Sequence, residues 1–136
     1  MQNIHIKSVI ISSLIVYLIA IVAFVSSYYY PILSDADLQA NYVLSIAIIP
    51  AALIGAHIYY RKGHDVNGFI LGVSMFLVAI VLDAFITVPL FIMPYGGSYS
   101  SFFIDPGFWL IGIEYIIAVA AFWKIKIARK KIMLSN

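Results

Sequence analysis

Long apolar stretches alternate with short polar ones along this chain. The four apolar stretches run from about Ser8 to Ser27, Tyr42 to Tyr60, Phe69 to Met93 and Gly107 to Trp123. Each is close to the ~20 residues that an α-helix needs to cross about 30 Å of hydrocarbon. The pattern therefore predicts an all-α fold, in which residues 1–136 form a single membrane domain built as a bundle of four transmembrane helices.

The first apolar stretch also has some features of a signal peptide, because Lys7 precedes it. Its apolar run of nearly twenty residues is longer than the ~7–15 of a signal h-region, which favours an uncleaved span. Composition agrees with a membrane protein, since 64% of residues are hydrophobic and 10% are charged, against roughly 25% charged in soluble domains. There is no cysteine, so disulfides, thiolate metal sites and cysteine nucleophiles are excluded.

Charge is distributed very unevenly between the connections. The basic residues all lie in the two tails and the second connection: Lys7, Arg61, Lys62, Lys124, Lys126, Arg129, Lys130 and Lys131. The first and third connections carry only acids, at Asp35, Asp37 and Asp105. The positive-inside rule then predicts that both termini and the second connection are cytoplasmic. A net charge of +2 gives no reason to expect nucleic acid as a partner.

Polar residues at the span ends predict where the helices begin and end. Ser34 with Asp37 three residues later resembles a capping box for the second helix, and Gly63 is a suitable stop for it. Asp65 or Asn67 can cap the third helix. Asp105 followed by Pro106 predicts the start of the fourth helix, which leaves residues 94–104 as a connecting loop.

Two carboxyl groups lie inside predicted spans, at Asp83 and Glu114. An acid near the bilayer centre costs at least ~2.5–3.5 kcal/mol on insertion scales, so both are candidates for a functional site. Counting along the helices places them at similar depth. Each shares a helix face with small residues, which is typical of helix contacts in membranes. We therefore expect the two acids to meet inside the bundle, with at least one of them protonated.

Other polar features fall at the same depth. Pro50 and Pro89 each remove a backbone hydrogen bond inside a span, which is predicted to free the carbonyl oxygens of Ile46 and Phe85. We predict one polar midplane pocket whose ligand-binding residues are Tyr17, Ser45, Asp83, Thr87, Glu114 and Tyr115. Such a pocket could bind or transport a proton, a cation or a small polar or lipid ligand.

The alternative is that the buried acids only bridge helices, in a structural or accessory subunit of a larger membrane complex. An enzyme is not favoured, because the sequence has no HExxH, GxSxG or thiol motif. His5, His57 and His64 are not placed for a bis-histidine haem, and we expect no metal or cofactor. The expected partners are the lipid bilayer and either a second copy of the chain or a larger membrane complex. A second copy is expected for a transport path, because four helices enclose little volume.

Aromatic residues are concentrated near the first and third connections, with runs at residues 28–30, 95–103 and 108–109. This is typical of interfacial anchoring. An alternative role for these aromatic residues is to form a lid over the pocket. Three segments, LDAFITVPLF (82–91), GGSYSSFFIDPGFW (96–109) and IGIEY (111–115), resemble a family of small four-helix bacterial membrane proteins known only as a domain of unknown function. The resemblance implies the bacterial inner membrane and no particular activity.

Overall fold

The computed structural model describes residues 4–128, and in that part of the chain it contains five α-helices and no strand. The α-helices are α1 (Ile6–Tyr29), α2 (Ala36–Tyr60), α3 (Gly68–Leu82), α4 (Tyr99–Ile104) and α5 (Pro106–Phe122). Two π-helical segments, η1 (Asp83–Ile92) and η3 (Trp123–Ala128), continue α3 and α5, and the short 3-10 helix η2 (Met93–Tyr95) follows η1. The predicted all-α fold is confirmed.

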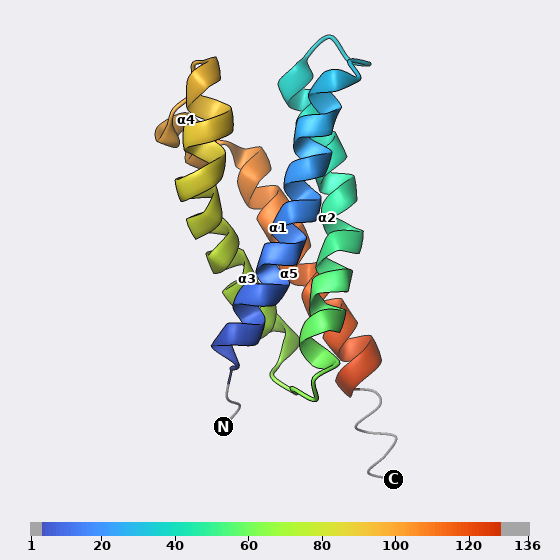
Figure 1. Cartoon of the computed structure of the whole chain (residues 1–136). Coiled ribbons are helices and arrows are strands. Elements are labelled where there is room, and N and C mark those ends of the chain that lie inside the picture. The colour runs from blue at the N-terminus through green and yellow to red at the C-terminus, as the bar shows by residue number, and fades with distance from the viewer. Residues whose placement is uncertain (1–3, 129–136) are drawn as a thin grey trace.

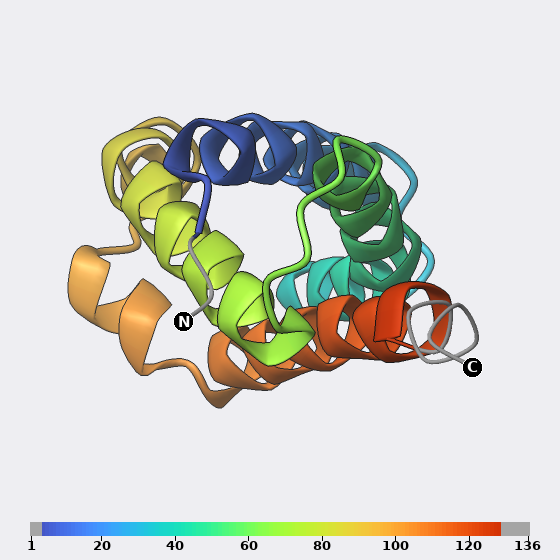
Figure 2. The same ribbon diagram turned by 90° about the horizontal axis from the view of Figure 1, so that it is seen from below.

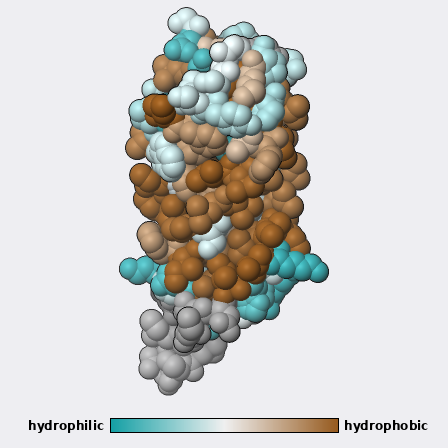
Figure 3. Space-filling model, turned by 90° about the vertical axis from the view of Figure 1, so that its left-hand side faces the viewer, coloured by the Kyte–Doolittle hydropathy of each residue, from teal (hydrophilic) through white to brown (hydrophobic). Residues whose placement is uncertain are grey.

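Four continuous helices are long and apolar enough to cross a membrane: Ile6–Tyr29, Ala36–Tyr60, Gly68–Ile92 and Pro106–Ile127. The predicted spans are therefore right in number, although the second helix begins six residues earlier than its apolar stretch. Figure 3 shows the corresponding surface, a broad hydrophobic band with more hydrophilic side chains above and below it. These helices suggest a multi-pass membrane protein.

The four spans form a ring in which α1 packs on α2 and α3, and α5 packs on α2 and α3; Figure 2 shows this ring end-on. The described chain begins and ends at one end of the bundle, and α4 lies at the other (Figure 1). We call the end with α4 the acidic end, after Asp35, Asp37 and Asp105. The other is the basic end, with Lys7, Arg61, Lys62, Lys124 and Lys126. Arg129, Lys130 and Lys131 of the predicted basic tail lie outside the described residues.

Close helix contacts depend on several glycines. A Cβ atom on Gly72 would lie 3.0 Å from the Cα atom of Ile116, so α3 and α5 meet almost backbone to backbone. A Cβ atom on Gly55 would lie 2.4 Å from Cγ2 of Val16, and one on Gly112 would lie 2.3 Å from the ring of Phe76. The small residues predicted as contact faces therefore include true contacts, as expected for helices that pack in lipid.

The helix caps agree in part with the sequence. Asn67 accepts a hydrogen bond from the backbone of Phe69, and Asp105 accepts one from Gly107. The predicted Ser34 cap is wrong, because Asp35 accepts from the Leu38 N–H and is the N-cap of α2. Carboxylates and hydroxyls are nearly equivalent caps, so sequence alone could not choose between these neighbours.

Gln39 holds the connection between α1 and α2, and sequence reasoning missed it. Its side chain is buried and forms four hydrogen bonds. Oε1 accepts from the N–H groups of Ile32 and Leu33, and Nε2 donates to the carbonyls of Ser27 and Tyr30. All of the hydrogen-bonding capacity of the amide is used. This fixes the connection over the acidic end.

The third span changes its hydrogen-bond register at Asp83. Within η1 the bonds join residues five apart, as in the bond from the Met93 N–H to the Val88 carbonyl. Because Pro89 has no N–H, the carbonyl that it leaves free in this register is that of Ala84, and not that of Phe85 as predicted. The Tyr99 hydroxyl donates to that Ala84 carbonyl at 2.9 Å.

Residues 94–104 are therefore more ordered than the predicted loop. Ser98 and Ser101 form a reciprocal capping box at the start of α4, in which serine replaces the Glu or Gln that the sequence motif has at the third helical position. Through Tyr99, α4 is attached to the π-helical half of the third span. The structure thus places a short aromatic helix beside the acidic end of the bundle.

Candidate functional site

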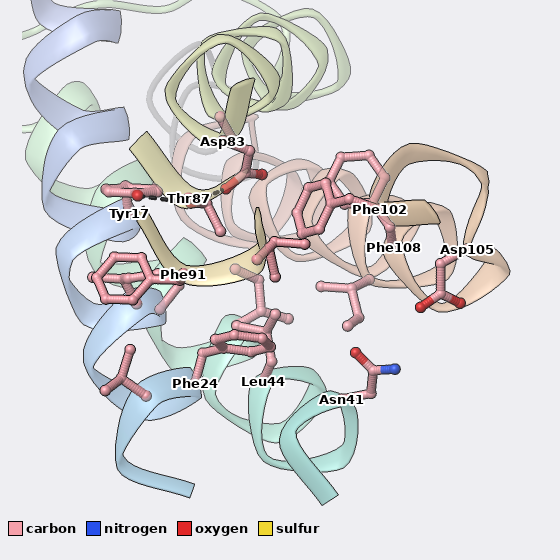
Figure 4. Close-up of a pocket in the computed structure, with 18 of the residues that line it drawn as sticks. Tyr17, Phe24, Asn41, Leu44, Asp83, Thr87, Phe91, Phe102, Asp105 and Phe108 are labelled. Atoms are coloured by element: carbon pink, nitrogen blue, oxygen red, sulfur yellow. Dashed lines mark hydrogen bonds between the residues drawn. The ribbon is translucent and has the colours of Figure 1, made fainter. Parts of the chain in front are cut away.

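Asp83 begins a chain of hydrogen bonds that links the third span to the first. Thr87, one turn further along η1, donates from Oγ1 to Oδ1 of Asp83 at 2.7 Å. The Tyr17 hydroxyl lies 2.7 Å from the same Thr87 oxygen, and Tyr17 is the donor because the Thr87 hydrogen is directed at Asp83 (Figure 4). The other carboxyl oxygen, Oδ2, has no hydrogen-bond partner among the described residues. One side of the Asp83 carboxyl group is therefore available to a ligand.

This chain lies on the wall of a cavity of about 720 Å³. The innermost lining residues are Val16, Ile48, Phe76 and Tyr115, and those nearest the acidic end include Tyr29, Asp37, Ser101 and Asp105. Three of the four innermost side chains are buried, whereas all four at the acidic end are exposed. The cavity is therefore closed in the middle of the bundle and opens at the acidic end.

The lining combines three carboxyl groups with apolar walls. Asp83 lies at middle depth, and Asp37 and Asp105 lie near the opening. Asp37 accepts a hydrogen bond from the Tyr28 hydroxyl at 2.9 Å, and Asp105 caps α5. None of the described lining residues is a lysine, arginine or histidine. The cavity therefore has an uncompensated negative character wherever these acids are ionised.

Of the six predicted ligand-binding residues, the structure brings four around this cavity: Tyr17, Asp83, Thr87 and Tyr115. Glu114 and Ser45 do not line it. Instead, the Ser45 hydroxyl donates to Oε1 of Glu114, which joins α2 to α5. The two residues are half-buried.

The expected pairing of Asp83 with Glu114 is therefore absent from the described structure. Asp83 has its hydrogen bond with Thr87, toward α1, and Glu114 has its own with Ser45, toward α2. The physical reason is rotation about the helix axis. Depth follows from counting residues, but the neighbour that a side chain meets depends on how each helix is turned, and α5 has α2 on one side and α3 on the other.

Three buried hydroxyl groups without a hydrogen-bond partner lie at the closed end of the cavity or next to it. Tyr115 is 3% exposed, and its hydroxyl has no hydrogen-bond partner. Ser12 and Ser13, one turn before Val16 on α1, also have buried hydroxyls without a partner. Buried polar groups normally have partners, and of these three residues Tyr115 alone lines the cavity, so its hydroxyl is available to water or to a polar group of a ligand.

Sequence reasoning missed the aromatic part of the site. Phe102 and Phe108 line the cavity with their ring centroids 5.1 Å apart, and Phe76 lies 5.7 Å from Phe108. Phe24 and Phe91 also line it (Figure 4). The available signal was the surplus of aromatic residues near the third connection, which we interpreted mainly as interfacial anchoring.

The histidines lie elsewhere, toward the basic end. The rings of His5 and His64 stack with centroids 3.7 Å apart, and the Ser8 hydroxyl lies 3.1 Å from Nε2 of His64. Burial and the nearby His5 ring lower the pKa of His64 from its ordinary value of 6.5. His57 is instead in edge contact with Phe122. Among the described residues there is no group of three side chains that could hold a metal ion.

Comparison with known proteins adds no further assignment, because no family model, curated protein or solved structure matches this chain. The candidate site therefore has to be interpreted from its own residues.

Proposed function

We propose that this chain is a small integral membrane protein that binds a ligand in the cavity at Asp83, with both termini in the cytoplasm. The bacterial inner membrane remains our prediction for its location, from the resemblance described above. The orientation rests on charge. The described basic residues of the tails and second connection lie at one end, and the opposite end carries only acids. In this orientation the cavity opens to the outside.

The observation that carries the binding function is the position of Asp83 on an open cavity. A carboxyl group at membrane depth is costly unless it is used or satisfied, and here only one of its oxygens has a partner. Thr87 and Tyr17 orient the carboxyl group, so that Oδ2 can accept from a ligand or hold a proton. The site is suited to a proton, a cation or a small ligand with a polar head, either bound or in transit.

The second candidate function is structural, as an accessory subunit of a larger membrane complex. It is favoured by Glu114, whose hydrogen bond with Ser45 joins two spans outside the cavity. This is the role that we considered for both acids. The hydrogen bond between Ser45 and Glu114 explains why Glu114 lies inside a span. It does not explain the cavity at Asp83.

Reporter fusions test the orientation. A reporter fused after Asn136 or inserted near Gly63 should be cytoplasmic, and one inserted near Gly97 should be external. A periplasmic reporter at Asn136 would overturn the proposed topology.

Cysteine accessibility tests the cavity, because the chain has no cysteine of its own. Ile111 lines the cavity, whereas Ile113 on the same helix is 54% exposed on the surface of the bundle. In proteoliposomes, Ile111→Cys should react with a water-soluble thiol reagent added at the acidic end. The matched Ile113→Cys variant, which faces lipid, should react much more slowly. Equal rates, or no reaction at Ile111→Cys, would contradict a water-filled cavity.

A further inference from the structure

The charge of the cavity restricts what can bind there. A ligand that travels from the opening to the closed end passes Asp37 or Asp105 and then reaches Asp83, and it meets no basic side chain among the described lining residues. An anion such as a lipid phosphate would be repelled at each step and would find no partner. A cation would be attracted along the same path.

The walls add a preference for an organic cation over a hydrated metal ion. Most of the lining is apolar, and a metal ion would have to exchange its water for very few oxygen ligands. The faces of aromatic rings attract cations, most strongly where water is excluded. Phe76, Phe102 and Phe108 form one aromatic cluster on this wall.

The length of the cavity indicates an elongated ligand. On α1 the lining runs from Val16 to Tyr29, which at ~1.5 Å per residue is about 20 Å. Asp83 lies seven residues beyond Phe76 in the third span, or about 10 Å from the closed end by the same rise. A bound molecule can therefore place its charge at Asp83 and still have apolar space on both sides.

We propose that the cavity binds a hydrophobic organic monocation, an amine or quaternary ammonium with an apolar chain, whose charged group is held by Asp83. This rests on the proposed binding function and names the ligand class of the same site. Asp37 and Asp105 attract the cation at the opening, and Thr87 keeps the carboxyl group of Asp83 directed into the cavity.

The test uses three probes with the same alkyl chain and different head charges: dodecyltrimethylammonium, dodecanol and dodecanoate. Full-length Ile111→Cys protein in nanodiscs is treated with N-ethylmaleimide in the presence of each probe. A charge interaction of about 1.4 kcal/mol makes the cation bind about tenfold more tightly than the alcohol. The cation should therefore slow labelling at about a tenfold lower concentration than the alcohol, and the anion should not slow it. In Ile113→Cys protein none of the probes should change the rate, which controls for effects on the bilayer.

Asp83→Asn should abolish the protection by the cation, and Asp83→Glu should restore it. The amide keeps the hydrogen-bond acceptor for Thr87, so the fold should persist. The comparison of the three probes does not depend on this variant. Equal protection by all three probes, or protection by the cation that survives in Asp83→Asn, would overturn the proposed ligand class.

The two proposals fail in different ways. If Ile111→Cys is labelled readily and the cation gives no protection, the cavity exists and the ligand class is wrong. If Ile111→Cys is not labelled by any reagent, the proposed binding function itself is wrong.

Discussion

Replacing Thr87 with valine should weaken the link between the first and third spans. Valine keeps the shape of threonine and removes the hydroxyl that bonds with both Asp83 and Tyr17. The bond with Tyr17 joins two membrane helices, where a hydrogen bond contributes about 0.6 kcal/mol on average. The bond with Asp83 lies within the third span and contributes about 0.5–1.5 kcal/mol, so the loss of both should lower the free energy of unfolding by about 1–2 kcal/mol. In Thr87→Ser, which keeps the hydroxyl, the Tyr17→Phe change should still cost about 0.6 kcal/mol, as in the wild type.

A double-mutant cycle separates the two bonds. Tyr17→Phe removes one of them and should cost about 0.6 kcal/mol. In the Thr87→Val background the same change should cost nothing more, because the Tyr17 hydroxyl has already lost its partner. Reversible unfolding of detergent-solubilised protein by titration with dodecyl sulfate measures all four proteins. Additive losses, or a Thr87→Val protein as stable as the wild type, would refute the hydrogen-bonded chain.

Three further predictions concern other parts of the bundle. Gln39→Leu removes four hydrogen bonds and should lower unfolding free energy in the same titration by about 2–4 kcal/mol. Ser45→Ala should cost about 1–3 kcal/mol because it leaves Glu114 without its partner, whereas Glu114→Gln, which keeps an acceptor, should cost less than half as much. Because the pKa of His64 is lowered in the folded protein, the unfolded chain binds more protons at acidic pH. Thermal stability should therefore be retained at pH 8 and fall as the pH drops below about 6.5; a flat profile would contradict this.

The hydrophobic pattern is sufficient to predict the four spans, and the polar residues at the span ends are sufficient to predict the Asn67 and Asp105 caps. These features can be recognised within short stretches of sequence. A span needs about 20 consecutive apolar residues to cross the bilayer, and a cap depends on a few neighbouring residues. The depth of Asp83 could be counted in the same way. The shift of η1 into a π-helical register could not be predicted in this way. It depends on the missing N–H of Pro89 and on the hydrogen bond from the Tyr99 hydroxyl to the Ala84 carbonyl, which comes from a distant part of the chain.

The site was predictable only in part for a similar reason. Tyr17, Thr87 and Asp83 face one cavity because α1 and the third span are turned toward each other, and Glu114 meets α2 because α5 is turned differently. Helix rotation is set by contacts such as Gly72 against Ile116, which are spread over the whole bundle. Counting residues along one helix does not contain that information.

The central claim is that a water-accessible cavity at Asp83 opens to one face of the membrane. The most direct test is NMR of the wild-type protein in nanodiscs, with isoleucine methyl groups labelled. The methyl groups of Ile111 should exchange magnetisation with water, and those of Ile113 should exchange it with lipid chains. Contacts of both residues with lipid, or of Ile111 with protein atoms alone, would contradict it.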